Sequence, residues 1–215
     1  MRSCFKLIVY LIFLQISSLH VGFKTLADSP KNYLKGKFYK TIENNFLVAT
    51  EKMNDSRFKK TVIIILDNDE TGSWGLVVNK PLGSIPLKFL INTSKDSNEK
   101  SKELYEVNIP IFWGGPVDEK QIYILHSSEY KNETTKKYKG ISVTRDRKIL
   151  FDIAENKGPK KSLVVLGYSG WGDGQLEGEM EMEHWILSEI SQKIIFEKKS
   201  ENKWIQAFES SFIRL

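Results

Sequence analysis

The segment from Leu163 to Glu177 places the strongest constraint on how this chain can fold. Its apolar start, Leu163–Leu166, is typical of a buried strand, and four glycines between positions 167 and 174 then interrupt any regular element. Residues 175–182 are mostly helix formers, so we expect a strand, a glycine-rich loop and a helix in that order. Such a junction leaves backbone N–H groups free to bind a ligand at a helix start, and it can equally serve only to turn a tight corner.

The rest of the chain reads as one α+β domain over residues 38–215. With 215 residues, 40% of them hydrophobic and 27% charged, the chain can bury one good-sized core. An aromatic content of 12% favours a core rich in sheet. The apolar runs predict strands at 46–50, 62–66, 74–79, 121–126, 185–187 and 193–196, and helices at 85–91 and 204–213. Asp67–Gly72 is expected to close a hairpin with a longer loop than the tightest type.

The first 27 residues differ in kind from the domain. Arg2 and Lys6 precede an apolar stretch from Leu7 to Leu14, and Ala27 offers a small residue just before Asp28. This layout is typical of a secretory signal peptide, with a membrane anchor or a misassigned start as the alternatives. We therefore expect a leader or anchor at 1–27, a polar tail at 28–37, and a protein that is exported, periplasmic or membrane-associated. A cytoplasmic protein is the alternative.

Charge and cysteine content narrow the function classes. The formal charge of +5 falls to +2 if residues 1–27, with three basic residues and no acid, are removed. A charge this small argues against nucleic acid as a partner of the mature domain. The single cysteine, Cys4, lies in the leader, so the domain can form neither a disulfide nor a zinc–thiolate site.

Three blocks of residues together resemble the YqgE/AlgH family, also called the AlgH-like family. They cover about residues 46–207. The first block is Phe46–Pro81, which includes Asp55-Ser56-Arg57-Phe58 and Gly75–Pro81. The second is Gly114–Val117 followed by Leu125-His126, and the third is Gly167–Glu179 with Trp185. The resemblance implies a compact domain whose sheet curls toward a small barrel flanked by helices. Some members carry a label as regulators of transcription, so that role is one alternative. This chain departs from the family pattern at Asp173, where proline is usual, at Glu183, where asparagine is usual, and in having a leader.

Two motifs of the glycine segment come close to known catalytic or nucleotide-binding patterns and fail. A nucleophile elbow needs glycine two residues after the serine, and Trp171 stands there after Ser169. A dinucleotide fingerprint needs a third glycine where Glu177 stands, and no Lys-Ser or Lys-Thr follows a glycine run as in a P-loop. The simpler interpretation is that these glycines permit positive φ and close packing.

An enzyme remains the second hypothesis. It would use His126, which ends a predicted strand, with Glu177 or Glu179 as its carboxylate partner on a small ligand. Each of these residues also has a structural interpretation, as a hydrogen-bonded histidine and as acids at the start of a helix. Glu177 and Glu179 lie two apart and would not share a helix face, which argues against paired-carboxylate chemistry.

The leading hypothesis is a non-enzymatic binding or regulatory domain without a metal or cofactor, whose partner is an unknown protein or small molecule. Its site is predicted where the loop at 114–117, His126 and the loop at 168–177 meet. The candidate binding residues are Gly114, Gly115, Pro116, His126, Tyr168, Trp171, Gly172, Gly174, Gln175, Glu177 and Glu179. A pocket enclosing His126 and a carboxylate would favour the enzyme, whereas a flat or filled surface would favour the binding domain.

Overall fold

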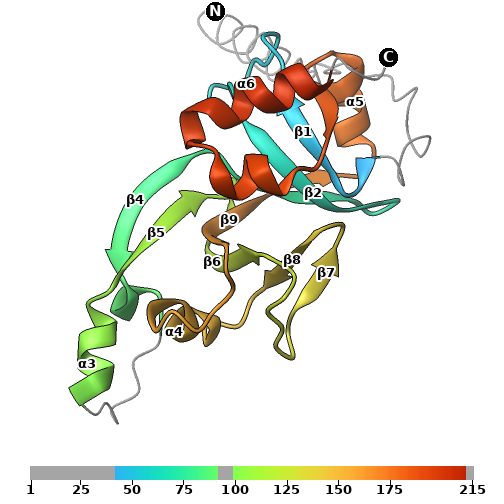
Figure 1. Ribbon diagram of the computed structural model, residues 1–215. Coiled ribbons are helices and arrows are strands. Elements are labelled where there is room, and N and C mark those ends of the chain that lie inside the picture. Colours follow the sequence, from blue (N-terminus) through green and yellow to red (C-terminus); the bar gives the residue numbers. More distant parts are fainter. Residues whose placement is uncertain (1–41, 92–98, 212–215) are drawn as a thin grey trace, which may run out of the picture. The chain divides into compact units, whose positions relative to one another are not determined.

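The computed structural model describes residues 42–91 and 99–211, all within the compact unit Asn32–Leu215. Its strands pair in the order β10-β1-β2-β3-β9-β6-β8-β7, with β4 and β5 alongside β9 (Figure 1). The pairing of β5 with β9 is parallel and the other described pairs are antiparallel. The predicted α+β class, with a curled mixed sheet flanked by helices, is confirmed.

The elements of this unit follow in chain order. The strands are β1 (Asn45–Ala49), β2 (Val62–Asp69), β3 (Gly72–Val77), β4 (Pro81–Pro86), β5 (Asn108–Trp113), β6 (Val117–His126), β7 (Lys136–Tyr138), β8 (Ile141–Thr144), β9 (Ser162–Gly172) and β10 (Trp185–Glu189). The helices are η1 (Leu87–Phe89), α3 (Glu99–Tyr105), α4 (Ile149–Ala154), α5 (Gln175–Glu181), η2 (Lys193–Glu197) and α6 (Ser200–Ser211).

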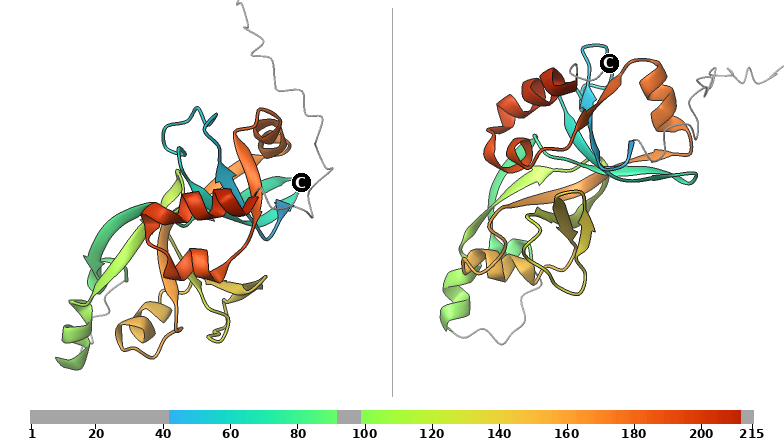
Figure 2. Two further views of the ribbon diagram at one scale, coloured as in Figure 1. Left: turned by 45° about the horizontal axis from the view of Figure 1, so that its top comes forward. Right: turned by 45° about the vertical axis from the view of Figure 1, so that its right-hand side comes forward.

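Strands β1 and β2 are buried on both faces, which explains why their sequences are continuous apolar runs. Alternate side chains point to opposite faces of a strand. Phe46 and Ile64 therefore join the cluster that contains Ala207 of α6, whereas Leu47 and Ile63 join the cluster that contains Leu176 of α5. The two helices lie on either side of these strands (Figure 2).

A third apolar cluster lies between β5, β6, β9, α4 and η1. Ile111, Ile124 and Val164 supply it from the three strands, and Leu150 and Leu87 supply it from the helices. Strand β9 thus connects this cluster with the glycine segment at its other end, and it pairs with β3, β5 and β6. The first half of β9 therefore lies between β5 and β6, and its last four residues pair with β3.

The strands predicted in the first half of the domain form, but the predicted hairpin loop and the predicted helix at 85–91 need correction. The hairpin between β2 and β3 turns at Glu70 and Thr71, so the expected longer loop is wrong. The Asp69 carboxylate accepts hydrogen bonds from the backbone N–H and the hydroxyl of Thr71 at 2.8 and 2.6 Å, which closes the tight turn. The prediction of a helix at 85–91 is also wrong in part, because Ile85 and Pro86 belong to β4 and only Leu87–Phe89 is helical.

Two corrections fall in the second half. The glycine segment was expected to be a loop, yet β9 continues through Gly172 and pairs with β3. The apolar run at 193–196 was expected to be a strand, yet it forms the helical turn η2, in which Ile194 and Ile195 are the buried residues. The predicted helix after Gly174 and the predicted C-terminal helix correspond to α5 and α6.

Some sequence predictions fall on residues that the structure does not describe. The leader or anchor at 1–27 and the tail at 28–37 lie outside the described ranges, as do residues 92–98 of the polar stretch 92–102, which predicts a loop but forms the start of α3 from Glu99 onward. Within residues 42–91 and 99–211, no helix is long and apolar enough to cross a membrane.

Candidate functional site

The structure brings the two glycine loops of the predicted site together, at van der Waals distance. A Cβ atom built on Gly114 would lie 2.2 Å from the carbonyl oxygen of Gly167, and one on Gly115 would lie 2.2 Å from the carbonyl carbon of Tyr168. Gly115 also has a φ of +146°. These positions therefore require glycine because the backbone of β9 passes directly against the segment after β5.

Ser169 contributes to the same backbone crossing. It is fully buried, and its hydroxyl donates a hydrogen bond to the carbonyl oxygen of Gly114 at 3.1 Å. Strand β9 continues past it to Gly172, so there is no strand-to-helix turn at the serine. The role of Ser169 in this geometry is to tie β9 to the segment after β5.

His126 is not part of this assembly, which corrects the predicted site. It pairs with Ser162 at the start of β9, whereas the glycine segment occupies Gly167–Gly172, five to ten residues or roughly 17–33 Å along that strand. Its ring is fully buried, with Nδ1 2.9 Å from the carbonyl oxygen of Ser127 and Nε2 2.8 Å from the hydroxyl of Thr144. Burial lowers the pKa of His126, so the neutral ring is favoured.

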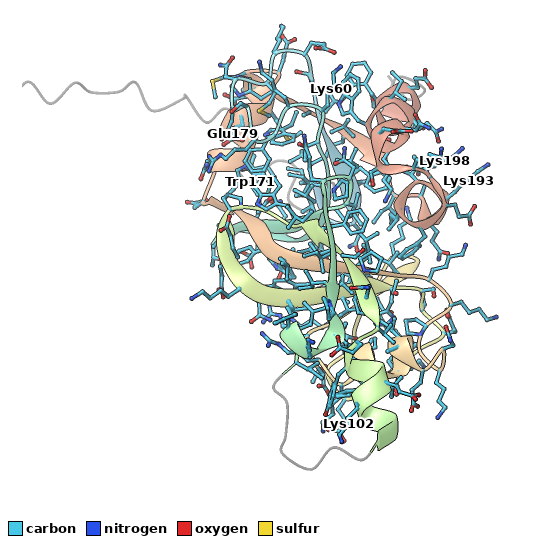
Figure 3. All side chains as sticks on the ribbon, turned by 90° about the vertical axis from the view of Figure 1, so that its left-hand side faces the viewer. Lys60, Lys102, Trp171, Glu179, Lys193 and Lys198 are labelled. Carbon is cyan, nitrogen blue, oxygen red and sulfur yellow. The ribbon has the colours of Figure 1, made fainter. Side chains whose placement is uncertain are left out.

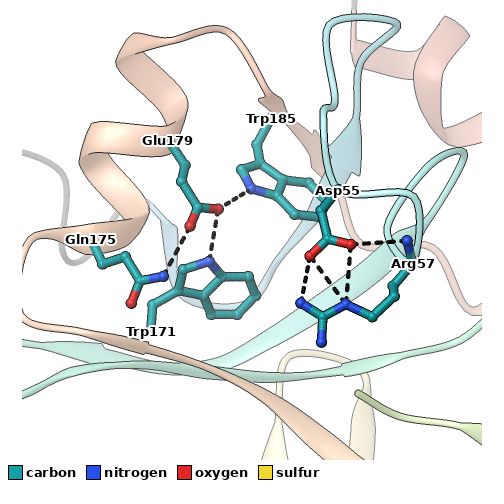
Figure 4. A network of polar contacts seen from close by, with 6 residues as sticks. All are labelled: Asp55, Arg57, Trp171, Gln175, Glu179 and Trp185. Carbon is teal, nitrogen blue, oxygen red and sulfur yellow. Dashed lines mark hydrogen bonds and ion pairs between the residues drawn. The ribbon is translucent and has the colours of Figure 1, made fainter. Parts of the chain in front are cut away.

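Glu179 serves as a hydrogen-bond acceptor for two tryptophans. Its Oε2 accepts from the indole N–H of Trp171 at 3.0 Å and from that of Trp185 at 2.7 Å (Figure 4). Its Oε1 accepts from the side-chain amide of Gln175 at 3.0 Å. The carboxylate thus joins α5 to β9 and β10.

The remaining candidates surround the start of α5. Gly174 has a φ of +69° and precedes the helix, and the side-chain oxygen of Gln175 accepts a hydrogen bond from the Gly172 N–H at 3.1 Å. Glu177 is only 2% exposed, on the buried side of α5. Because His126 lies at the far end of β9, the structure does not assemble the histidine–carboxylate pair of the enzyme hypothesis. Pro116 lies beside the crossing and is half-buried.

A cleft of about 640 Å³ opens where β6 separates from β9. The two strands pair at Val117 and again at Ile122, with a register shift between these positions. Four residues of β6 stand between these two pairs against one residue of β9, so β6 is bulged there, and the β2–β3 hairpin supplies the other wall of the cleft. The described lining residues are Asp67, Asp69, Thr71, Gly72, Ser73, Trp74, Val117, Asp118, Gln121, Tyr123, Arg145, Tyr168, Gly170 and Trp171.

Three aromatic rings form the floor of this cleft. The ring centroids of Trp74 and Tyr123 are 5.6 Å apart, those of Trp74 and Tyr168 are 6.2 Å apart, and those of Tyr123 and Tyr168 are 6.1 Å apart. Burial raises the pKa of the Tyr123 hydroxyl, so that group is neutral at physiological pH. Gly170 leaves room above the floor, since a Cβ there would meet the Tyr168 ring at 3.2 Å.

Arg145 lies over this aromatic floor. Its guanidinium carbon is 5.0 Å from the ring centroid of Tyr123 and 5.7 Å from that of Trp74, within the range of cation–π attraction. Its Nη2 lies 3.5 Å from the Tyr123 hydroxyl, and the side chain is otherwise exposed. The cleft therefore combines aromatic faces, a loosely held arginine and the carboxylates of Asp67, Asp69 and Asp118.

Sequence reasoning found one wall of this cleft and missed the rest. Tyr168 and Trp171 line it as members of the predicted site, but Trp74, Tyr123 and Arg145 come from β3, β6 and the segment after β8. Nothing local marks these three as neighbours, because strand register alone brings them together. The aromatic residues at the ends of apolar runs were the only available signal.

Comparison with known proteins agrees with the blocks quoted above. A family model described as AlgH-like matches residues 46–215. The chain belongs to the AlgH-like family. It is 34% identical over 168 residues to a UPF0301 protein of Shewanella sp. strain ANA-3, covering 78% of this chain and 89% of that one. It is 37% identical over 180 residues to a UPF0301 protein of Pseudomonas putida strain W619, covering 84% and 88%.

Solved structures show the same fold. The solution structure of the AlgH protein from Pseudomonas aeruginosa is similar with a TM-score of 0.65 and 30% identity, over 80% of this chain and 90% of that one. A crystal structure of a Corynebacterium diphtheriae protein is similar with a TM-score of 0.60 over 80% and 88%, and at 14% identity this likeness concerns the fold alone. The AlgH-like assignment thus covers the strands that form the cleft.

Proposed function

We propose that this AlgH-like protein is a non-enzymatic binding protein whose ligand site is the aromatic cleft between β3, β6 and β9. The observation that carries the proposal is a cleft of about 640 Å³ over an aromatic floor, in the size range of small-molecule sites. The positions of the candidate acid–base groups also support a binding protein over an enzyme. His126 and Glu177 are buried outside the cleft, and Glu179 is occupied by three hydrogen-bond donors.

The cleft also suits binding because its walls are fixed. The Gly114–Gly115 crossing holds the start of β6 against β9, and the Glu179 carboxylate holds the Trp171 ring from behind. Figure 3 shows Trp171 beside Glu179, on the opposite side of the domain from Lys193 and Lys198 of the η2 region. A ligand would therefore meet a preformed aromatic surface, which lowers the entropic cost of binding.

A screen of small aromatic and polar fragments by amide NMR shifts tests this proposal. We expect the fragments that bind to shift the amide signals of Gly72, Gly170 and Tyr168 together. Trp74→Ala should abolish those shifts, because it removes part of the floor, whereas Phe89→Ala should leave them unchanged, because Phe89 is 70% exposed on η1 outside the cleft. Hits that cluster elsewhere, or that survive Trp74→Ala, would refute the cleft as the ligand site.

We further propose that the protein acts outside the cytoplasm. The support is the sequence of residues 1–27, with its basic start, apolar middle and small residue at Ala27. Fractionation of the native host, with mass spectrometry of the N-terminus, should find a mature chain that begins near Asp28. An intact N-terminus in the cytosolic fraction would overturn this proposal and leave the cleft proposal unaffected.

A further inference from the structure

We propose that the cleft binds an organic cation, a guanidinium or alkylammonium group, and that Arg145 is the chain's own occupant of that position. The inference rests on the proposed function, because it names the ligand class of the same cleft. Three features support it: the aromatic faces, the surplus of negative charge around them and the way in which Arg145 is held.

The aromatic faces are the first feature. The face of a tryptophan or tyrosine ring attracts cations, and tryptophan attracts them most strongly. Trp74, Tyr123 and Tyr168 lie within 6.2 Å of one another, centroid to centroid, with interplanar angles of 39°, 88° and 72°. Because these rings pack against one another, a small cationic head would lie over the surface that they share, in the position of the Arg145 guanidinium.

The second feature is the charge of the cleft. Among the described lining residues, three aspartates and one arginine give a formal charge of −2, whereas the whole chain carries +5. Hydrogen bonds from Thr71 lower the pKa of Asp69, so its carboxylate stays ionised. A concave surface lined by one sign of charge raises the local concentration of the opposite ion. The cleft therefore attracts cations although the chain as a whole repels them.

The third feature is the weak hold on Arg145. Its contacts with the described residues are the two ring faces and one 3.5 Å approach to the Tyr123 hydroxyl, at the limit of hydrogen bonding. No ion pair within 4.0 Å joins it to Asp67, Asp69 or Asp118, which are described residues of the same cleft. An exposed, flexible side chain held this way can be displaced by a ligand that presents the same chemistry.

An anionic ligand on Arg145 is the competing interpretation, and the charges oppose it. A phosphate or carboxylate that reached the guanidinium would approach three carboxylates in the same cleft. The two interpretations predict opposite effects of removing the arginine. Without Arg145, a cation gains free ring faces and a cleft charge of −3 in place of −2, whereas an anion loses its only cationic partner among the described lining residues.

The test is a calorimetric titration with N-acetyl-arginine amide, tetramethylammonium and N-acetyl-glutamate amide, on the full chain and on variants. We expect the two cations to bind, and Arg145→Gln to tighten their binding by roughly two- to fivefold, the worth of one displaced cation–π contact at an exposed side chain. Arg147→Gln is the matched control. It removes the same charge two residues away, outside the described lining of the cleft, and should change affinity by less than about twofold.

Two further variants separate the charge from the rings. Asp67→Asn combined with Asp118→Asn should weaken cation binding several-fold, and this effect should shrink at high salt, because exposed charges are screened. Trp74→Ala should weaken it at any salt concentration. Circular dichroism should confirm that each variant is folded.

The outcomes decide between the hypotheses. If Arg145→Gln weakens cation binding, or if the glutamate amide binds and loses affinity in that variant, the cation proposal is wrong. If no cation binds while neutral fragments still shift the cleft amides, the ligand class is wrong and the binding function stands. If nothing shifts those amides, both fail. A pentapeptide with a central arginine that binds much more tightly than N-acetyl-arginine amide would identify a protein segment as the source, and equal affinity a free organic cation.

Discussion

Lys203 offers the sharpest test of the fold, because it is a buried lysine without a carboxylate partner among the described residues. It is 2% exposed on the buried face of α6, and its ammonium group donates hydrogen bonds to the carbonyl oxygens of Val78 at 2.9 Å and Ile195 at 2.6 Å. The Phe112 ring centroid lies 5.5 Å from the nitrogen. Burial lowers the pKa of Lys203 from 10.5 to about 8. The folded state therefore opposes the charged form.

This pKa shift fixes the direction in which stability changes with pH. Between pH 8 and 10.5 the unfolded chain holds a proton on Lys203 that the folded chain has released, so the free energy of unfolding rises with pH. Each unit of pKa shift corresponds to about 1.4 kcal/mol, so we expect a gain of about 2 kcal/mol between pH 7 and 9.5. Above pH 10 the raised pKa values of Tyr123 and Tyr138 act in the opposite direction, because their folded forms retain the proton.

The assay is urea unfolding of the wild type and of Lys203→Met at pH 7 and pH 9.5, with far-UV circular dichroism as the signal. The difference in unfolding free energy between wild type and variant should change by about 2 kcal/mol in favour of the wild type as pH rises. Lys120→Met, which alters an exposed lysine on β6, is the control and should run parallel to the wild type. Equal pH dependence in wild type and Lys203→Met would refute the argument, whatever the absolute stability of the variant.

Three other substitutions or conditions test the remaining features. Gly115→Ala should cost several kcal/mol and lower the melting temperature sharply, because its Cβ would lie 2.2 Å from the Tyr168 carbonyl carbon, and an unchanged melting temperature would contradict the backbone crossing. Glu179→Leu should cost about 2 kcal/mol in urea unfolding, because it leaves two indole N–H groups unpaired. Acidification below about pH 6.5 should reduce stability through His126, since burial lowers its pKa and the unfolded chain binds the proton first, and His126→Gln should flatten that part of the pH profile.

The sequence predicted most reliably the elements that are buried on two faces. The runs Phe46–Ala49 and Val62–Leu66 are apolar throughout because α5 and α6 cover opposite sides, and a continuous run of β-branched residues has few alternatives to a central strand. The run at 193–196 also contains consecutive apolar residues, yet it forms a helical turn in which Ile194 and Ile195 are buried and Phe196 packs against the same core. A short apolar run does not distinguish strand from helix, and tertiary packing decides.

The cleft could not be predicted for a different reason. Trp74, Tyr123 and Arg145 are separated by 22 or more positions, and they line one cleft only because β3, β6 and the segment after β8 meet there in the folded chain. His126 shows the converse error: the sequence suggested that it lies near the glycine segment, and the structure separates the two. Its strand was predicted well, but the length of β9 that separates it from the glycine segment was not, because the glycines suggested that the strand ended at Leu166.

The glycines of the AlgH-like motif acquire a common explanation once β9 is seen to continue through them. Gly114, Gly115 and Gly167 permit a backbone contact that any side chain would block, and this contact fixes the point at which β6 leaves β9. The cleft opens at that point, and Gly170 keeps the face of Tyr168 uncovered. A motif that resembles a phosphate-binding loop in composition therefore shapes an aromatic surface: Gly170 and Gly172 lie in β9 opposite β3, and the Gly172 N–H donates a hydrogen bond to the side chain of Gln175. The side chains around the glycines, more than the glycines themselves, should determine what this protein binds.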